Sequence, residues 1–106
     1  MTPDVSIVVP VFNETGNVGP LAREIAAAFA GQAYEMIFVD DASTDSTRAD
    51  LIALKAELPS LRVLSHQRNS GQSRSVRTGI LAARAAIVVT MDGDGQNDPA
   101  DAPRLA

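Results

Sequence analysis

The sequence predicts a three-layer α/β domain built on a mostly parallel sheet. Four short apolar runs, of the composition found in buried strands, recur along the 106 residues. The three segments between them are long enough for helices and carry apolar residues at helical spacing. Strands that alternate with helical crossovers form a parallel sheet with helices on both faces. We therefore expect three strand–helix units, a fourth strand and the beginning of a fourth helix.

The first predicted strand is the apolar run 5–12, which we expect to end near Pro10 because proline cannot donate to a strand ladder. A polar loop, residues 13–17, follows it. The next segment is predicted to be an amphipathic helix closed by Gly31 as its C-cap. Its inward-facing residues are Val18, Leu21, Ile25, Ala28 and Phe29.

The second predicted strand, residues 36–39, ends on the acidic pair Asp40 and Asp41. The helix that follows is expected to begin at a polar N-cap and to stop before Pro59. Its candidate N-caps are Ser43, Thr44 and Asp45. Its inward-facing residues are Leu51, Leu54 and Leu58.

The third predicted strand, residues 61–64, leads into the polar loop 66–71, and a third helix follows. The buried face of that helix is predicted to carry Val76, Ile80 and Ala83. The fourth strand is the β-branched run 87–90. Asp98 before Pro99 places a cap residue ahead of a proline at the first helical position, which predicts a fourth helix.

Composition and charge exclude several classes of protein. An apolar content of 45% with 21% charged residues is typical of a folded globular domain. The net charge of −4 argues against a nucleic-acid partner, because a phosphate backbone requires a basic face. The absence of cysteine excludes disulfides and thiolate metal sites. No apolar run approaches the roughly 20 residues of a membrane span, and no signal peptide precedes the first strand, so we expect a cytoplasmic location.

The clearest chemical signal is the turn after the fourth predicted strand. Asp92 and Asp94 are separated by Gly93, and Gly95 and Gln96 follow. Oxygen ligands of this kind suit Mg²⁺ or Mn²⁺. The alternative is an ordinary acidic turn, in which aspartate and glycine are common. An EF-hand is excluded because Asn97 and Pro103 occupy the positions that need glycine and glutamate.

Polar residues also follow the other predicted strands. In a parallel α/β sheet, ligands bind beyond the carboxyl ends of the strands, where helix N-termini offer free N–H groups to anions. The residues concentrated there are Asn13, Glu14, Asp40, Asp41, Arg68, Asn69, Asp92 and Asp94. Neither a G-x-G-x-x-G dinucleotide fingerprint nor a G-K-[ST] phosphate loop is present. The pattern predicts a phosphorylated ligand bridged by a metal ion.

Four motifs carry a resemblance to a known family. They read VVPVFNE at 8–14, VDDASTD at 39–45, RNSGQ at 68–72 and MDGDGQNDP at 91–99. In this order and spacing they resemble family 2 glycosyltransferases of the Rossmann-like GT-A fold, and among these the dolichyl- and polyprenyl-phosphate sugar transferases. Ala42 stands where the family usually has glycine, and Gly93 and Gly95 replace bulkier residues. The resemblance implies that residues 1–106 are the nucleotide-sugar-binding N-terminal part of such a domain, truncated after the fourth strand, with the acceptor half absent.

The resemblance also implies a role for individual residues. The nucleotide-sugar-binding residues would be Pro10, Asn13, Glu14, Asp40, Asp41, Arg68 and Asp92. The ligands of Mg²⁺ or Mn²⁺ would be Asp92, Asp94 and Gln96. No residue of the chain is assigned a certain catalytic role.

The implied reaction is inverting transfer of a sugar from a UDP- or GDP-sugar to a polyprenyl phosphate. The metal would neutralise charge on the leaving diphosphate. An acceptor phosphate with a second pKa of about 6 is already an anion at neutral pH and needs no general base. The 106-residue chain is expected to transfer little sugar alone, and membrane association is expected of a longer protein.

Two other functions compete with this one. The D-x-D-G order at 92–95 resembles haloacid-dehalogenase-like phosphatases, but there the motif follows the first strand and threonine stands in place of Gln96. The second alternative is a half-domain that binds nucleotide without catalysis or self-associates, because a sheet cut after four strands exposes an edge through which a homodimer could form. Simpler interpretations also apply: His66 as an ordinary loop residue, Arg74 and Arg77 as a solvated helix face, and Asp45 and Asp98 as helix caps.

Overall fold

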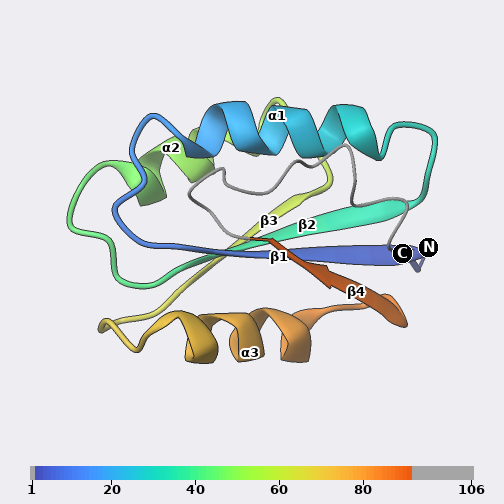
Figure 1. The fold of residues 1–106 in the computed structure, drawn as a ribbon. Coiled ribbons are helices and arrows are strands. Elements are labelled where there is room, and N and C mark those ends of the chain that lie inside the picture. The colour runs from blue at the N-terminus through green and yellow to red at the C-terminus, as the bar shows by residue number, and fades with distance from the viewer. Residues whose placement is uncertain (1, 92–106) are drawn as a thin grey trace.

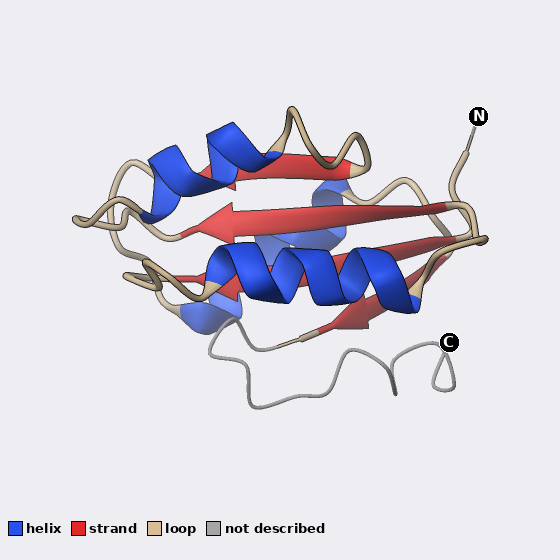
Figure 2. Ribbon diagram, turned by 90° about the horizontal axis from the view of Figure 1, so that it is seen from above, coloured by secondary structure: helices blue, strands red, loops and turns tan. Residues whose placement is uncertain are grey.

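The computed structural model describes residues 2–91 as one parallel sheet with helices on both faces (Figures 1 and 2). Met1 and residues 92–106 are outside the described residues. The elements are β1 (Val5–Val11), α1 (Val18–Ala28), β2 (Tyr34–Asp40), α2 (Thr47–Leu54), β3 (Leu61–Ser65), α3 (Gln72–Ala82) and β4 (Ile87–Thr90). All the strand pairs are parallel, in the order β3-β2-β1-β4. The predicted three-layer α/β fold is confirmed; the predicted helix at Asp98 and Pro99 is outside the described residues.

The sheet separates two apolar layers, with α1 and α2 on one face and α3 on the other (Figure 1). On the α1 and α2 side, Phe29 and Phe38 are fully buried in the larger cluster. On the α3 side, Val8, Ile37 and Val39 form the smaller cluster. Burying each side chain of this size stabilises the fold by roughly 1.5–3 kcal/mol. Both faces of the central strands β1 and β2 are covered by helices, which explains why their sequences are almost entirely apolar.

β1 ends at Val11, one residue after Pro10, which agrees with the expected end near Pro10. The Val8 carbonyl accepts a hydrogen bond from Met91 at 3.0 Å, on the β4 side, and the Val11 carbonyl accepts one from Asp41 at 2.9 Å, on the β2 side. Because hydrogen-bonding direction alternates along a strand, Pro10 faces the β4 side, beyond the pairing of β4 with Val5 to Val8. Its missing N–H therefore breaks no bond of the described ladder.

The predicted buried face of α3 is wrong in part. The residues of α3 that lie buried against the sheet are Ser75 and Gly79, whereas Ile80 is 46% exposed. A Cβ atom on Gly79 would lie 2.3 Å from Cγ1 of Val8, so the helix and the sheet approach too closely there for any side chain. Ala83, just after the helix, packs on the smaller cluster as expected.

The ends of the first two helices differ slightly from the predictions. α1 ends at Ala28 with Phe29 as C-cap, and Gly31 turns the chain two residues later with φ 88°. α2 has Ser46 at its N-cap position, after all three predicted candidates. Asp45 nevertheless accepts a hydrogen bond from the N–H of Thr47 at 2.9 Å, so it satisfies an N–H of the first turn. Leu51 and Leu54 are buried as predicted, and Leu58 packs against the larger cluster.

A buried polar cluster that sequence reasoning missed lies at the opposite end of the sheet from the predicted site. Glu35, only 5% exposed, accepts hydrogen bonds from the Ser6 hydroxyl at 2.6 Å, from Arg62 at 2.8 Å and from the N–H of Arg84 at 2.7 Å. Burial raises the pKa of Glu35, but these hydrogen bonds and the charge of Arg62 outweigh it and hold that pKa below its ordinary value. Arg62 also donates to the carbonyl of Ala82 at the end of α3. The cluster fixes the turn from α3 into β4.

None of the helices described between residues 2 and 91 has the length and apolar character needed to cross a bilayer.

Candidate functional site

Three polar loops meet at the carboxyl ends of the strands, and we call them together the carboxyl rim. They are residues 12–17 after β1, residues 41–46 after β2 and residues 66–71 after β3, together with the strand ends Asp40 and Ser65. Met91, directly after β4, lies at the same edge and donates a hydrogen bond to the carbonyl of Val8. The sequence prediction that these loops share one edge is confirmed for the described residues.

The loops after β1 and β2 are joined by side-chain hydrogen bonds. The Asn13 side-chain oxygen accepts a bond from the N–H of Thr44 at 2.8 Å, and the Asn13 N–H donates to the Ser43 hydroxyl at 2.9 Å. The Glu14 N–H donates to the Thr47 hydroxyl at 2.8 Å. Because the two loops hold each other, Asn13 and Glu14 have defined positions before any ligand binds.

Asp40 holds Ser43 in the loop after β2. It is 2% exposed, and its Oδ1 accepts hydrogen bonds from both the N–H and the hydroxyl of Ser43. Its carboxylate therefore shapes the turn after β2 in this structure. The implied contact of Asp40 with a nucleobase remains a prediction.

Asp41 joins the loop after β2 to the loop after β3. Its Oδ1 lies 2.8 Å from Nδ1 of His66 and accepts from the N–H of Ser70 at 2.8 Å, and its Oδ2 accepts from the N–H of Gly71 at 2.8 Å. Gly71 is the N-cap residue of α3 and has φ 95°, a conformation that favours glycine. A carboxylate at this helix N-terminus is favoured by the helix dipole.

The hydrogen bonds of Asp41 determine its ionisation. Burial, at 4% exposure, raises the pKa of the carboxyl group. The hydrogen bonds from His66, Ser70 and Gly71 and the electrostatic interaction with His66 outweigh burial and hold the pKa of Asp41 below its ordinary value. Asp41 is therefore a carboxylate at neutral pH, fixed in orientation.

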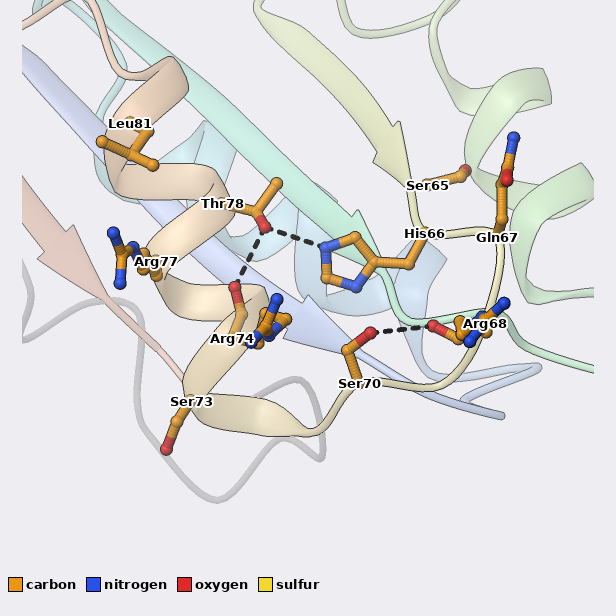
Figure 3. A pocket seen from close by; sticks show the side chains of 10 residues that line it. All are labelled: Ser65, His66, Gln67, Arg68, Ser70, Ser73, Arg74, Arg77, Thr78 and Leu81. Atoms are coloured by element: carbon orange, nitrogen blue, oxygen red, sulfur yellow. Dashed lines mark hydrogen bonds between the residues drawn. The ribbon is translucent and has the colours of Figure 1, made fainter.

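His66 lies in a loop, as we expected, but it is more than an ordinary loop residue. Its Nε2 lies 2.8 Å from the hydroxyl of Thr78, which in turn donates to the carbonyl of Arg74 at 3.0 Å (Figure 3). The ring thus connects Asp41 on the carboxyl rim to the second turn of α3. No spacing or motif in the sequence indicates this link, since Thr78 is an unremarkable helix residue.

Asp45 forms a second carboxylate anchor. Its Oδ1 accepts from the N–H and hydroxyl of Thr47, and its Oδ2 accepts from the N–H of Thr15 at 3.3 Å. The pKa of Asp45 is lowered to about 2, and the hydrogen bond from the Thr47 hydroxyl is the largest cause. Burial acts in the opposite direction. The N–H of Thr47 and the hydrogen bonds with Thr15 lower the pKa further. The interpretation of Asp45 as a capping residue is supported.

Two residues of the carboxyl rim other than glycine have a positive φ. Asn13 has φ 51° and Ala42 has φ 62°. Asparagine tolerates this region, whereas for alanine it costs roughly 1–2 kcal/mol. The substitution of alanine for the glycine usual in the resembled family therefore places local strain directly after Asp41.

Of the remaining predicted site residues, Pro10 and Arg68 lie at the carboxyl rim, and the others are outside the described residues. Pro10 lies near the carboxyl end of β1, and exposed Arg68 lies in the loop after β3. A cavity of about 540 Å³ opens between the ends of β2 and β3. The predicted metal ligands Asp92, Asp94 and Gln96 are outside the described residues. Within residues 2–91, no three acidic, histidine or cysteine side chains group closely enough to hold a metal ion.

A parallel sheet with preorganised polar loops at its carboxyl ends is the arrangement in which α/β domains bind ligands at that edge. The particular family follows from sequence comparison: the chain belongs to glycosyl transferase family 2, whose model matches residues 6–106. This confirms the resemblance drawn from the four motifs.

Curated proteins similar to this chain include transferases whose names specify a polyprenyl phosphate. The chain is 44% identical over 105 residues to the dodecaprenyl-phosphate galacturonate synthase of Rhizobium johnstonii, covering 96% of this chain and 31% of that protein. It is 38% identical to the undecaprenyl-phosphate 4-deoxy-4-formamido-L-arabinose transferase of Pseudomonas paraeruginosa, covering 95% of this chain and 31% of that protein. The chain thus spans about a third of the length of these relatives.

Solved structures have the same fold. The mannosyltransferase PcManGT from Pyrobaculum calidifontis, in complex with GDP-Man and Mn²⁺, has a TM-score of 0.82 and 25% identity over 95% of this chain and 30% of that chain. TarS 1-349 from S. aureus, in complex with UDP-GlcNAc, has a TM-score of 0.77 and 26% identity over 86% of this chain and 26% of that chain. These neighbours confirm the GT-A type of fold.

Proposed function

We propose that this chain forms the nucleotide-sugar-binding part of an inverting, metal-dependent glycosyltransferase that transfers a sugar to a polyprenyl phosphate. The observation that carries the proposal is the carboxyl rim, in which Asp41 fixes one predicted donor-binding loop against another through His66, Ser70 and Gly71. Family membership and the names of the curated relatives support the reaction class.

Donor binding uses the rim as a preformed surface. An ionised carboxylate offers about four acceptor positions, and Asp41 accepts three hydrogen bonds within the described residues. One position therefore remains for an N–H donor on the edge of a nucleobase. Asn13 and Glu14, held by the loop after β2, border the nucleotide together with Pro10, and Arg68 supplies positive charge toward the base or the phosphates. Because these groups are already ordered, binding loses little further conformational entropy.

The metal completes the donor site in this proposal. Asp92, Asp94 and Gln96 offer carboxylate and amide oxygens, the donor set that Mg²⁺ and Mn²⁺ prefer. These three residues would hold the ion, and Asp92 would also border the nucleotide sugar. When bound, the ion neutralises negative charge on the departing nucleoside diphosphate. The structural neighbour PcManGT, in complex with GDP-Man and Mn²⁺, supports this choice of metal.

The acceptor in this proposal is a polyprenyl phosphate, the lipid class named in the curated relatives. A phosphate monoester with a second pKa near about 6 is largely dianionic at neutral pH, so it attacks without a general base. We propose that transfer occurs in the cytoplasm at the membrane surface and requires residues beyond this chain, since the relatives are about three times as long. The 106 residues alone would bind donor and transfer little sugar.

A second candidate function is self-association through the β4 edge. β4 is four residues long, Ile87 on it is 46% exposed, and Leu81 at the end of α3 is 75% exposed. Apolar side chains beside an unpaired strand edge favour contact with another chain. Sedimentation velocity over a hundredfold range of concentration tests this, and a constant monomer would contradict it.

Isothermal titration calorimetry tests the donor proposal. GDP-sugars and UDP-sugars would be titrated into the chain with and without Mn²⁺, and binding that requires Mn²⁺ is expected for one nucleotide class. Asp94→Asn should remove the dependence on Mn²⁺ and weaken binding at least tenfold, corresponding to about 1.4 kcal/mol. Asp4→Asn, which changes an exposed aspartate ahead of β1, is the matched control and should bind like the parent chain. Equal binding with and without metal in all three proteins would contradict the metal role.

A further inference from the structure

Positive charge is concentrated in one part of this acidic chain. Residues 59–91 contain five arginines and one histidine but none of the 13 aspartates and glutamates. Arg62 within this segment is neutralised by buried Glu35 at 2.8 Å. The other arginines of the segment are Arg68, Arg74, Arg77 and Arg84. The segment is therefore a basic region in a protein with a net charge of −4.

Three of these arginines line a groove of about 940 Å³ between the end of β3 and α3 (Figure 3). We call it the arginine groove; it is defined by Arg68, Arg74 and Arg77 and by the hydroxyls of Ser70, Ser73 and Thr78. Arg68 extends from the loop on one side and Arg74 from the helix on the other, with the His66 ring between them in this view. Among residues 2–91, no carboxylate lines the groove.

The three guanidinium groups have no counter-charge in the part of the chain that the structure describes. The ion pairs found there are Arg23 with Glu57, Arg62 with Glu35, and His66 with Asp41. The side chains of Arg68, Arg74 and Arg77 make neither an ion pair nor a hydrogen bond to residues 2–91. Arginine side chains are suited to bidentate recognition of phosphate, and in this groove they lie among hydroxyl-bearing residues.

The arginine groove overlaps the carboxyl rim along the loop after β3 and extends beyond it along α3. Its described lining residues all come from residues 65–81, and none comes from the loop after β1. Arg74 and Arg77 lie on the helix, beyond the loop that carries Arg68. The hydrogen bond between His66 and Thr78, at 2.8 Å, ties the loop to the helix and fixes the spacing of the two walls.

We propose that the arginine groove is a second phosphate-binding site, which shares only Arg68 with the proposed donor site. Its ligand is a phosphate group, either free in solution or on the headgroup of an anionic lipid. Arginine remains charged at all physiological pH values, so binding depends on salt and only weakly on the ionisation of the protein. The proposal does not rest on the nucleotide-sugar function, because Arg74 and Arg77 have no part in the donor site.

The first test is an NMR titration of the chain with inorganic phosphate and with pyrophosphate. Saturable amide shifts are expected in residues 65–81. Arg77→Ala should weaken the affinity about three- to tenfold, the effect of losing one charge-assisted contact. Arg84→Ala removes the same charge outside the groove and should change the affinity less than twofold. Arg77→Lys keeps the charge but loses the planar guanidinium group, so its affinity for phosphate should lie between those of Arg77→Ala and Arg84→Ala.

The second test separates the two sources of phosphate. Vesicles of phosphatidylcholine with phosphatidic acid or phosphatidylglycerol would be sedimented with the parent chain, Arg77→Ala and Arg84→Ala. Sedimentation that Arg77→Ala selectively reduces identifies a lipid headgroup as the ligand, whereas binding of free phosphate alone identifies a soluble one. The proposal is overturned by the absence of binding in both tests, by equal losses in Arg77→Ala and Arg84→Ala, or by shifts confined to residues 13–17 and 41–43.

Discussion

The carboxylate of Asp41 and the ring of His66 meet at 2.8 Å, 25 residues apart in sequence, and this contact holds two loops of the carboxyl rim together. The same ring reaches Thr78 on α3. A single imidazole thus couples the loop after β2, the loop after β3 and the helix that follows. Because Asp41 is buried and Thr78 is partly buried, removal of the ring should affect the stability of the fold as well as the shape of the rim.

The first prediction concerns His66. His66→Ala should lower the free energy of unfolding by about 1–3 kcal/mol, because Asp41 and Thr78 lose a hydrogen-bond partner in a buried setting. Urea denaturation followed by circular dichroism measures this change. Thr78→Val removes only the outer hydrogen bond and should cost about 1 kcal/mol. Equal stability of the parent chain and His66→Ala would show that the ring contributes nothing to the rim.

The second prediction concerns the left-handed residue after Asp41. Ala42→Gly should raise the free energy of unfolding by about 0.5–1 kcal/mol, since φ 62° strains alanine but not glycine. The control is Ala53→Gly at an exposed position of α2. This substitution should lower stability by about 0.5–1 kcal/mol, because glycine is unfavourable within a helix. Thermal melts of both variants measure the two effects. Destabilisation by both substitutions would contradict the strain at Ala42.

The third prediction concerns the close contact of α3 with the sheet. Gly79→Ala should destabilise the protein by about 1–3 kcal/mol, because its Cβ would lie 2.3 Å from Cγ1 of Val8 and the helix must move away. Gly19→Ala in α1 is the matched control, since its Cβ would meet only the flexible end of Arg23, at 3.2 Å. That substitution should be neutral or stabilising, by up to about 1 kcal/mol, from helix propensity. A stabilised Gly79→Ala would refute the proposed packing.

The fourth prediction concerns acid. The pKa values of Asp41 and Glu35 are both lowered in the folded protein, so the stability that these carboxylates contribute is present above their ordinary values of 3.8 and 4.5. That stability is lost as the pH falls through the lower folded values, because the protonated groups accept fewer hydrogen bonds. Urea midpoints measured from pH 6 to pH 2.5 should decline most steeply below about pH 4.5. Glu35→Gln should be less stable at pH 6 and should decline less, whereas an identical decline would contradict the role of Glu35.

Much of the fold could be predicted because it depends on local patterns. Apolar runs identify β1 to β4, helical spacing identifies α1 and α2, and the parallel topology places the polar loops at one edge. The same reasoning misplaced the buried face of α3, because sequence periodicity favours Ile80 as a core residue. It cannot reveal that Gly79 lets the helix approach Val8 so closely that the small residues face inward instead.

The candidate site was predictable as a set of loops but not as a network. Asn13, Glu14, Asp40 and Asp41 all lie at the carboxyl rim, as the motifs indicated. His66 and Thr78 depend on tertiary contacts between residues 12 positions apart with no motif of their own. The Glu35 cluster was missed for the same reason, since its partners come from β1, β3 and the turn after α3.

The central claim is that the carboxyl rim binds a nucleoside diphosphate with a divalent ion at the turn after β4. Crystals of the chain grown with GDP or UDP and Mn²⁺ test it most directly, with anomalous scattering used to locate the manganese. The expected result is a nucleotide between Asn13, Asp41 and Arg68, with Mn²⁺ bound by Asp92 and Asp94. A nucleotide bound elsewhere, or manganese held by other residues while that turn remains empty, would contradict the account.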